Sequence, residues 1–217
     1  MKKVYKKIFD EFTANVVPVD CGEKCRHLNE GTPVCCDIEN AVPIMDKSEY
    51  KLLRSRSKLW RKYRPPNEHG EELVESLHDD CVACECKGAM FCERDNRSLS
   101  CRAFPFFPYI TKAGDFIGMA TYWTFEDRCW VISNMKKVTP EFVTEFHNVY
   151  ERLFKYKPDE FDVFKDYSAT MRRVFSRWKR PIYIVDRDRD FHAILPKGAG
   201  MEPVRKRDLP KFGPYAE

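Results

Sequence analysis

The chain has 217 residues, a formal net charge of +4, 43% hydrophobic residues and 10 cysteines. This length suits one large domain or two small ones, and this hydrophobic content excludes an intrinsically disordered chain. The slight positive charge gives no reason to expect a nucleic-acid partner.

The N-terminal segment, residues 1–20, is predicted to be a short amphipathic lead-in. Asp10 and Glu11 interrupt it before an apolar stretch forms, so we expect no secretory signal. No apolar run is long enough to span a bilayer, and we expect no membrane partner. The expected location is cytoplasmic, where clustered cysteines act as metal ligands more often than they form disulfides. A framework of five disulfides is the disfavoured alternative.

Seven cysteines form a two-part pattern that is typical of a metal site. Thiolates are soft donors that select zinc, copper(I) or iron–sulfur clusters. A zinc ion or a cubane iron–sulfur cluster takes four protein ligands, so seven exceed one such site. Two sites, or one site with auxiliary thiols, both stay open. The pattern reads Cys21-x3-Cys25-x9-Cys35-Cys36 and then Cys86-x5-Cys92-x8-Cys101.

Between the two cysteine groups, the spacing of apolar residues predicts a helix from Asp46 to Tyr63. Its opposite face is rich in Lys and Arg, and a solvated helix face is favoured there over nucleic-acid contact. Pro65 and Pro66 end this helix. A shorter helix is predicted over 71–78, before the second cysteine group.

After Cys101 the pattern predicts regular elements in close succession. Strands are expected over 106–111 and 116–124, joined by a Lys-Ala-Gly-Asp turn, with a third strand over 129–132. Thr139-Pro140 predicts a helix start, and Pro158 separates that helix from a second one ending near Trp178. A hairpin over 182–185 and 191–195 follows. The tail from Pro196 is expected to be a surface arm.

These elements predict an α+β fold in which a loop-rich cysteine-cluster region is supported by amphipathic helices and short antiparallel hairpins. We place the cysteine-cluster metal-binding region at 1–135. The helical and hairpin support region is placed at 136–217, packed with the first as one globular unit.

Several residues near the pattern have two interpretations. Cys81 and Cys84 are either auxiliary ligands or small packed residues, whereas Cys129 is expected to be buried in an apolar strand. Asp37 either orients a ligand or binds iron, or else it makes a turn or a cap. Positive charge at Arg97 and Arg102 either lowers the pKa of nearby thiols, binds an anion, or belongs to surface ion pairs. The aromatic run 104–109 either shields a cluster from water or belongs to the core.

The two cysteine groups together resemble the motifs of the YkgJ-like cysteine-cluster family, which is described as chelating zinc or iron. The resemblance rests on the paired Cys35-Cys36, on Cys86 and Cys92, and on Cys101-Arg102-x-Phe104-Pro105. Ser98 stands where the family pattern has proline, and the first motif is longer than the family's compact one. The resemblance covers residues 21–108 and implies metal binding, without naming the metal. The flagellin lysine N-methylase shares a similar cysteine motif.

The sequence therefore predicts a metal-binding protein that holds an iron–sulfur cluster, or iron, through Cys21, Cys25, Cys35, Cys36, Cys86, Cys92 and Cys101. It would serve a redox or protein-modifying reaction, with a protein partner or protein substrate. The alternative is a non-catalytic module that binds structural zinc. No nucleotide-binding loop or serine nucleophile motif is found, so whether the chain is an enzyme, and through which catalytic residues, stays open.

Overall fold

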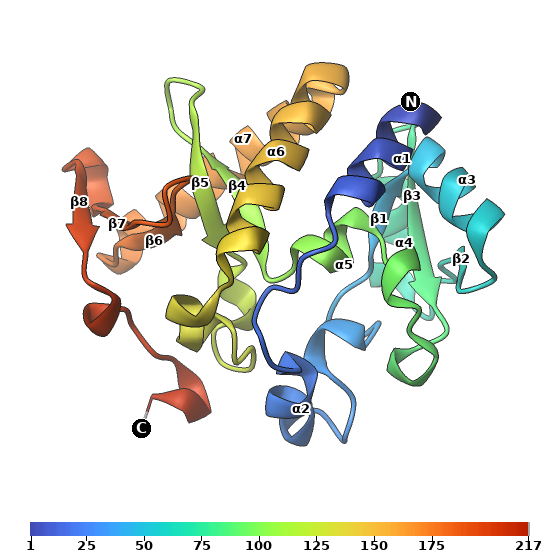
Figure 1. The fold of residues 1–217 in the computed structure, drawn as a ribbon, viewed down its shortest axis with the longest axis horizontal. Coiled ribbons are helices and arrows are strands. Elements are labelled where there is room, and N and C mark those ends of the chain that lie inside the picture. Colours follow the sequence, from blue (N-terminus) through green and yellow to red (C-terminus); the bar gives the residue numbers. More distant parts are fainter. Residues whose placement is uncertain (217) are drawn as a thin grey trace. The chain divides into compact units, whose positions relative to one another are not determined.

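The computed structural model describes residues 1–216 and shows a mixed α+β protein with antiparallel sheets, as predicted (Figure 1). The chain divides into two compact units, which are described separately. We call them the cysteine unit, Met1–Glu11 with Gly22–Phe104, and the aromatic unit, Phe12–Cys21 with Pro105–Glu217. The division falls at Phe104, not after residue 135 as predicted from the sequence, because the hairpin that follows Phe104 pairs with later strands.

A three-stranded antiparallel sheet in the order β1-β3-β2 forms the centre of the cysteine unit. It consists of β1 (Ile44–Asp46), β2 (Trp60–Lys62) and β3 (Cys81–Cys86). Helices α1 (Lys2–Glu11) and α3 (Lys47–Arg56) contact one another, and α3 also contacts all three strands. Strand β3 ends at Cys86, the first residue of the second cysteine group, and lies in a region that the sequence predicts to be rich in loops.

Helix α3 is shorter than the helix predicted to reach Tyr63. The Asp46 side chain caps its start by accepting a hydrogen bond from the Ser48 amide, and the backbone becomes extended at Ser57. Trp60 then enters β2 opposite Cys86 and is buried, so pairing with β3 prevails over the helical pattern.

Short elements complete the cysteine unit. Asn67 caps α4 (Glu68–Glu75) through the Gly70 amide, which starts this helix earlier than predicted. Helix α5 (Leu99–Ala103) carries Cys101. Helix α2 (Cys21–Cys25) begins at the last residue of an aromatic-unit segment and continues into the cysteine unit.

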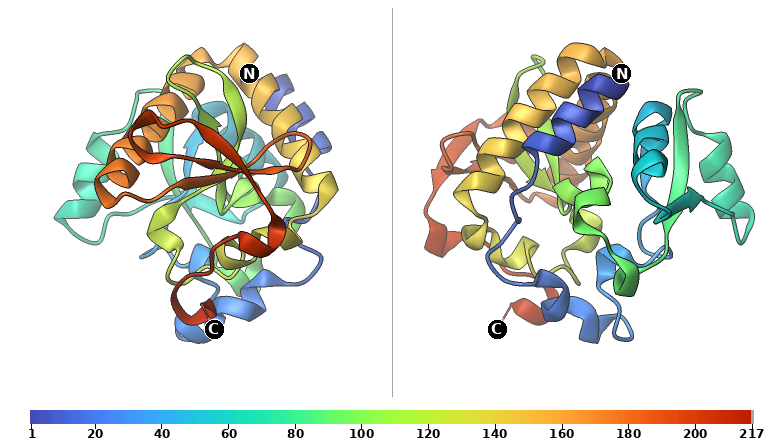
Figure 2. Two further views of the ribbon diagram at one scale, coloured as in Figure 1. Left: turned by 90° about the vertical axis from the view of Figure 1, so that its left-hand side faces the viewer. Right: turned by 45° about the vertical axis from the view of Figure 1, so that its right-hand side comes forward.

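The aromatic unit is built on a five-stranded antiparallel sheet in which β4 to β8 follow in chain order. The left view of Figure 2 shows β6, β7 and β8 side by side. The predicted hairpins are confirmed, with register Phe107 opposite Ala120 and Tyr183 opposite Ala193. The strands are β4 (Phe106–Ile110), β5 (Phe116–Thr121), β6 (Ile182–Val185), β7 (Phe191–Ile194) and β8 (Met201–Val204).

One sequence prediction for this unit is only partly right, and another is wrong. The expected surface arm after Pro196 contains β8, which pairs with β7 and extends the sheet. The expected strand at 129–132 is instead a turn that leads into a 3₁₀ helix, Ile132–Lys137. Apolar residues there are buried, as in a strand, but the backbone is bonded locally, with the Cys129 amide donating to the Phe125 carbonyl at 2.8 Å.

Two long helices cover the sheet, α6 (Pro140–Tyr156) in front and α7 (Pro158–Trp178) behind in Figure 1. Thr139 caps α6 as predicted. On one face, Phe106 packs against Phe142 of α6 with ring centroids 5.9 Å apart. On the other face, Phe107 and Tyr109 form the core with Met171 and Phe175 of α7. Alternation along β4 thus supplies both helices with aromatic contacts.

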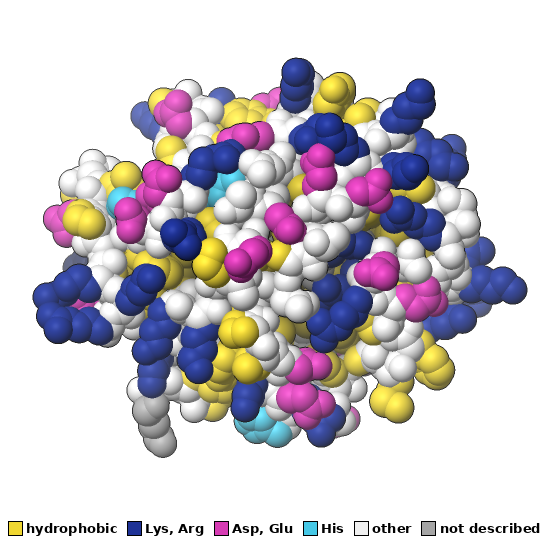
Figure 3. Space-filling model, in the orientation of Figure 1, with side chains coloured by type: hydrophobic (Ala, Val, Ile, Leu, Met, Phe, Trp, Pro, Cys, Tyr) yellow, Lys and Arg dark blue, Asp and Glu magenta, His cyan; other side chains and the backbone are white. Residues whose placement is uncertain are grey.

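Charge is unevenly distributed over the surface. Figure 3 shows Lys and Arg side chains gathered over α3 and β2, where Lys51, Lys58 and Lys62 are exposed. None of the helices within residues 1–216 combines the length and the apolar character that crossing a bilayer requires.

Candidate metal centre

Four of the seven predicted ligands are brought together in the cysteine unit. Cys36 ends a 3₁₀ turn, Cys86 ends β3, Cys92 follows the turn Ala89–Phe91, and Cys101 lies in α5. Cys36 lies within electrostatic range of the other three thiols, and Cys86 lies within range of Cys92 and Cys101. Two segments about fifty residues apart in sequence therefore converge at this point.

Burial sets the protonation of these thiols. It raises the pKa of Cys101 to about 12, and it is also the main cause of the raised pKa values of Cys86 and Cys92. Each of the three also feels the negative charge that Cys36 would carry, which raises its pKa further. The positive charge of Arg97 acts in the opposite direction on Cys92 and Cys101. Protonated thiols can approach one another without charge repulsion.

Local hydrogen bonds hold two of the thiols in place. The Ser98 hydroxyl caps α5 by accepting the Cys101 amide at 3.1 Å, and it also lowers the Cys101 pKa. The Gly88 amide donates to the Cys86 sulfur at 3.4 Å. Gly88 has φ of +95°, a conformation that favours glycine, so the turn that aims this amide at the sulfur depends on it.

Arg102 organises the loop between Cys92 and Cys101. Its guanidinium donates to the carbonyl oxygen of Asp95 at 2.7 Å and to that of Arg97 at 3.2 Å, and it lies over the Phe9 ring at 4.9 Å. Arg102 is only 7% exposed, and burial lowers its pKa to about 10. The surface ion pair considered from the sequence is therefore wrong for Arg102.

Two buried residues that are distant in sequence also form hydrogen bonds to the backbone of this loop and of the start of α5. Glu49 of α3 is buried and accepts the Leu99 amide at 2.7 Å, at the start of α5. The indole nitrogen of Trp60 donates to the Asn96 carbonyl at 2.7 Å. Both were missed in the sequence, because no local pattern marks these long-range contacts. Ser98 could have been found, since a serine directly before a short helical run is an N-cap signal.

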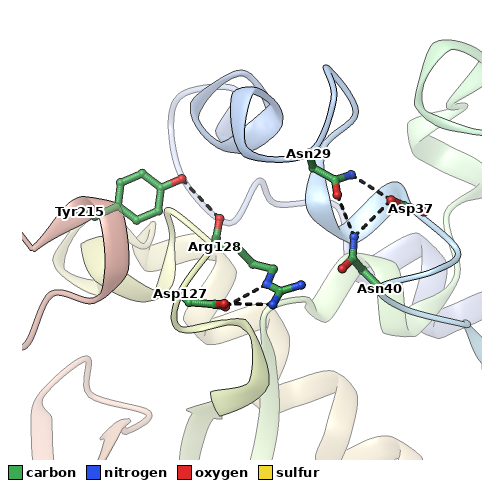
Figure 4. A network of polar contacts seen from close by, with 6 residues as sticks. All are labelled: Asn29, Asp37, Asn40, Asp127, Arg128 and Tyr215. Atoms are coloured by element: carbon green, nitrogen blue, oxygen red, sulfur yellow. Dashed lines mark hydrogen bonds and ion pairs between the residues drawn. The ribbon is translucent and has the colours of Figure 1, made fainter.

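A polar network shapes the loop that presents Cys35 and Cys36. The Asp37 carboxylate accepts the Asn29 amide at 3.0 Å and the Asn40 amide at 3.2 Å (Figure 4). It also accepts the Glu39 backbone amide at 3.0 Å. Of the roles considered for Asp37, the turn is the one that the structure shows. Figure 4 also draws a network of the aromatic unit, in which Arg128 pairs with Asp127 and its carbonyl accepts from Tyr215.

The other three predicted ligands have different surroundings. Cys21 is half-buried at the first residue of α2 and belongs to the aromatic unit in the division of the chain. Cys25 is buried at the end of α2, and its thiol donates to the Gly22 carbonyl at 3.6 Å. Cys35 is half-buried and precedes Cys36 on the same 3₁₀ turn.

The three cysteines outside the pattern differ in their burial and in their contacts. Cys84 is fully buried and donates to the Val82 carbonyl, and its pKa is raised to about 12 by burial and by Glu49. Cys81 is half-buried beside Asp80. Cys129 is buried, as predicted, within the aromatic unit.

Two roles were open for the aromatic run after Cys101, a shield for a cluster and a part of the core. Phe106, Phe107 and Tyr109 are fully buried in the core of the aromatic unit, as residues of β4. The core interpretation of this run is therefore the one that the structure supports.

The converging thiols are neighbours without being a formed coordination shell. In the part of the chain that the structure describes, residues 1–216, no group of three or more His, Cys, Asp or Glu side chains is arranged so that it could hold a metal ion. Comparison with protein-family models, curated proteins and solved structures gave no match to this chain. The resemblance to the YkgJ-like family stays a prediction from the motif.

Proposed function

We propose that the cysteine unit binds an iron–sulfur cluster through Cys36, Cys86, Cys92 and Cys101. The observation that carries this proposal is that the Cys36 thiol lies within electrostatic range of the other three thiols, and the Cys86 thiol within range of Cys92 and Cys101. Four cysteines are the usual ligand set of [2Fe–2S] and [4Fe–4S] clusters. The same four residues all belong to the motif that resembles the YkgJ-like family.

The ligand spacing supports a cluster over an ordinary structural zinc site. Structural zinc sites usually contain ligand pairs separated by two to four residues. Here Cys86 and Cys92 are separated by five residues, Cys92 and Cys101 by eight, and Cys36 lies far before them. A four-thiolate zinc module is nevertheless the second candidate, since four thiolates are also zinc's ligand set.

The surroundings of the thiols suit an anionic cluster. The Arg97 and Arg94 guanidiniums would offset part of the negative charge that four thiolates bring, since both already favour the charged form of Cys92. The Gly88 amide would keep its hydrogen bond to the Cys86 sulfur, a contact of the kind that tunes cluster potentials. Closing the shell would require the thiols to lose their protons and move together.

A bound cluster would supply one-electron redox chemistry at a surface that a protein can approach. Cys92 is exposed, and the preceding loop carries Met90 at 93% and Phe91 at 65% exposure. Exposed apolar side chains next to a redox centre fit contact with a protein partner or a protein substrate. We propose such a redox or protein-modifying role, with catalytic residues undefined.

Anaerobic preparation of the full chain tests the proposal directly. The expected protein is brown, contains iron with acid-labile sulfide, and loses its visible absorption in air. Cys101→Ser is expected to remove most of the colour. The matched control, Cys129→Ser, changes a buried cysteine of the other unit and should keep the colour.

Two outcomes would overturn the iron–sulfur proposal. Colourless protein with stoichiometric zinc and no sulfide would replace it with the zinc module. Absence of any bound metal in protein prepared without chelators, under either iron or zinc supply, would remove the metal-binding function itself.

A further inference from the structure

A cavity of about 390 Å³ lies within the aromatic unit. Its apolar lining includes Ile117 and Ile182 from the sheet and Phe175 from α7. The turn that joins β7 to β8 forms a further wall. This volume and this lining are those of a site for a small organic molecule.

Among the residues that the structure describes, one charged side chain in the cavity, that of Arg172, has no counterion. Arg172 of α7 donates to the Ile110 carbonyl at 2.7 Å and to the Tyr109 hydroxyl at 3.2 Å, and it lies over the Tyr109 ring at 5.5 Å. Among residues 1–216, no carboxylate lies within ion-pair distance of it. The two hydrogen bonds hold the guanidinium in position and leave its charge uncompensated, with N–H groups to spare.

The remaining charges strengthen the positive character of the cavity. Lys112 lines it from the β4–β5 turn, and Arg180 lines it with its charge balanced by Glu126 at 2.9 Å. No Asp or Glu is part of the lining formed by the described residues. The nearest acidic residue of that turn, Asp115, is bonded to Thr111. An anion entering the cavity would therefore meet two cations without carboxylate partners.

The wall formed by the turn between β7 and β8 is held in a defined conformation. The Lys197 amide donates to the Ser176 hydroxyl of α7 at 3.0 Å, and the Leu195 amide donates to the Gly200 carbonyl at 2.8 Å. Lys197, Gly198 and Gly200 all have positive φ, between 61° and 110°. Such a turn, anchored to the helix, keeps the cavity formed before a ligand arrives.

We infer that this cavity binds a small amphipathic anion, with a carboxylate or phosphate head on Arg172 and an aliphatic or aromatic body against the isoleucine and phenylalanine walls. The head would form charge-assisted hydrogen bonds to the guanidinium, while the body would leave water for an apolar surface. The inference is independent of the proposed metal centre, since it uses residues of the aromatic unit alone.

A matched set of eight-carbon probes tests it by calorimetry on the full chain. Octanoate and octyl phosphate carry the anionic heads, octan-1-ol is neutral, and octylamine is cationic. We expect at least one anion to bind with a Kd of about 1 mM or tighter, an affinity that a ligand with this number of non-hydrogen atoms can reach. Octanol should bind about tenfold more weakly and octylamine more weakly still, because charged hydrogen bonds supply the difference. The two anions show which head is preferred.

Variants assign the anion to Arg172. Arg172→Met should weaken anion binding about tenfold and leave octanol binding unchanged. Arg173→Gln is the control, because Arg173 is the exposed neighbour of Arg172, donates to Thr170 and does not line the cavity. If Arg172→Met does not fold, Lys112→Gln at the exposed turn should still weaken anion binding several-fold, more at low salt. Equal affinity for octanoate and octanol, no anion binding, or equal effects of Arg172→Met and Arg173→Gln would overturn the inference.

Discussion

In the aromatic unit, two helices of 17 and 21 residues bury aromatic rings against both faces of a five-stranded sheet. The cysteine unit instead joins a three-stranded sheet to shorter helices and several 3₁₀ turns. Ring pairs such as Phe146–Tyr150, at 4.6 Å, link the first unit continuously. In the cysteine unit, loops are held by polar side chains such as Arg102 and Asp37.

Buried polar side chains hold the helix starts and loops of the cysteine unit. In the cysteine unit, three side chains accept hydrogen bonds from backbone amides at helix starts, namely those of Asp46, Glu49 and Ser98. The Arg102 guanidinium donates to carbonyl oxygens of a loop. The contacts of Glu49, Ser98 and Arg102 hold the segment that carries Cys101, a proposed ligand. A unit built in this way gains most from an added ligand, whereas a unit built on ring packing depends on its core residues.

Metal removal is expected to produce the largest effect and to test most directly whether the two units differ in their dependence on a ligand. In anaerobically prepared protein, chelation should raise amide hydrogen exchange in residues 22–104 by about a hundredfold or more, because the lost ligand stabilised only the folded unit. Helices α6 and α7 should be unaffected. Cys101→Ser should show the raised exchange before chelation. Unchanged exchange in verified metal-free protein would contradict the contrast between the units.

Truncation of a buried aromatic side chain is expected to destabilise the aromatic unit and not the cysteine unit. Phe146 is fully buried and contacts Phe12, Phe142 and Tyr150. Phe146→Ala should lower the free energy of unfolding of the aromatic unit by about 3–5 kcal/mol. Urea unfolding followed by near-ultraviolet circular dichroism measures this loss.

Two controls sharpen this prediction. Val163→Ala, at a side chain that is 61% exposed on α7, should change stability by less than about 0.5 kcal/mol. Metal content per chain should be the same in Phe146→Ala and the unchanged protein. A Phe146→Ala protein that folds but loses its metal would show that the two units are not independent in stability.

Acid is expected to weaken the aromatic unit through one buried histidine. His147 is 2% exposed and stacks on Phe116 at 4.9 Å, and burial is the main cause that lowers its pKa to about 4. Its Nε2 has no hydrogen-bond partner within the described residues. An unfolded histidine titrates near pH 6.5, so the unfolded state binds the proton first as pH falls.

The stability contributed by neutral His147 is thus present above about pH 6.5 and falls by about 3 kcal/mol as pH drops towards 4. The measurement is the urea midpoint against pH for the unchanged protein and for His147→Phe. The variant should lose this component and keep the carboxylate contributions that both proteins share. Superimposable profiles would contradict the assignment.

The elements that proved predictable are those specified by their own residues. Thr139-Pro140 and the apolar stripe of α6 define that helix without any partner, and the turn at 112–115 defines the β4–β5 hairpin. Strand β3 reads Cys-Val-Ala-Cys-Glu-Cys, with no clear alternation, and it becomes a strand because β1 and β2 pair with its two edges. Such pairing depends on distant segments and leaves little local signal.

The candidate site divides in the same way. The convergence of Cys36 with Cys86, Cys92 and Cys101 was expected from motif and spacing. The contacts of Glu49 with Leu99 and of Trp60 with Asn96 join residues 50 and 36 positions apart, beyond the range of any pattern. The sequence left two roles open for the aromatic run after Cys101, a shield and a part of the core, because sequence proximity does not show that a new structural unit begins at Pro105.

The smallest expected effects come from two helix caps, one in each unit. Ser98 caps α5 at the Cys101 amide, and Thr139 caps α6 at the Phe142 amide. Ser98→Ala and Thr139→Ala should each cost about 1 kcal/mol of unfolding free energy in their own unit, measured by urea unfolding. Because the caps are chemically similar, any further difference between the variants reflects what each helix carries.

Helix α5 carries a proposed ligand and α6 does not. Ser98→Ala should therefore also weaken metal retention about tenfold in competition with a chelator, as loss of a ligand-orienting group does. Ser98→Thr keeps a hydroxyl cap and should restore both stability and retention, while Thr139→Ala should leave retention unchanged. If Ser98→Ala lowers stability but holds metal as tightly as the unchanged protein, the cap supports the helix alone and does not position Cys101 for metal.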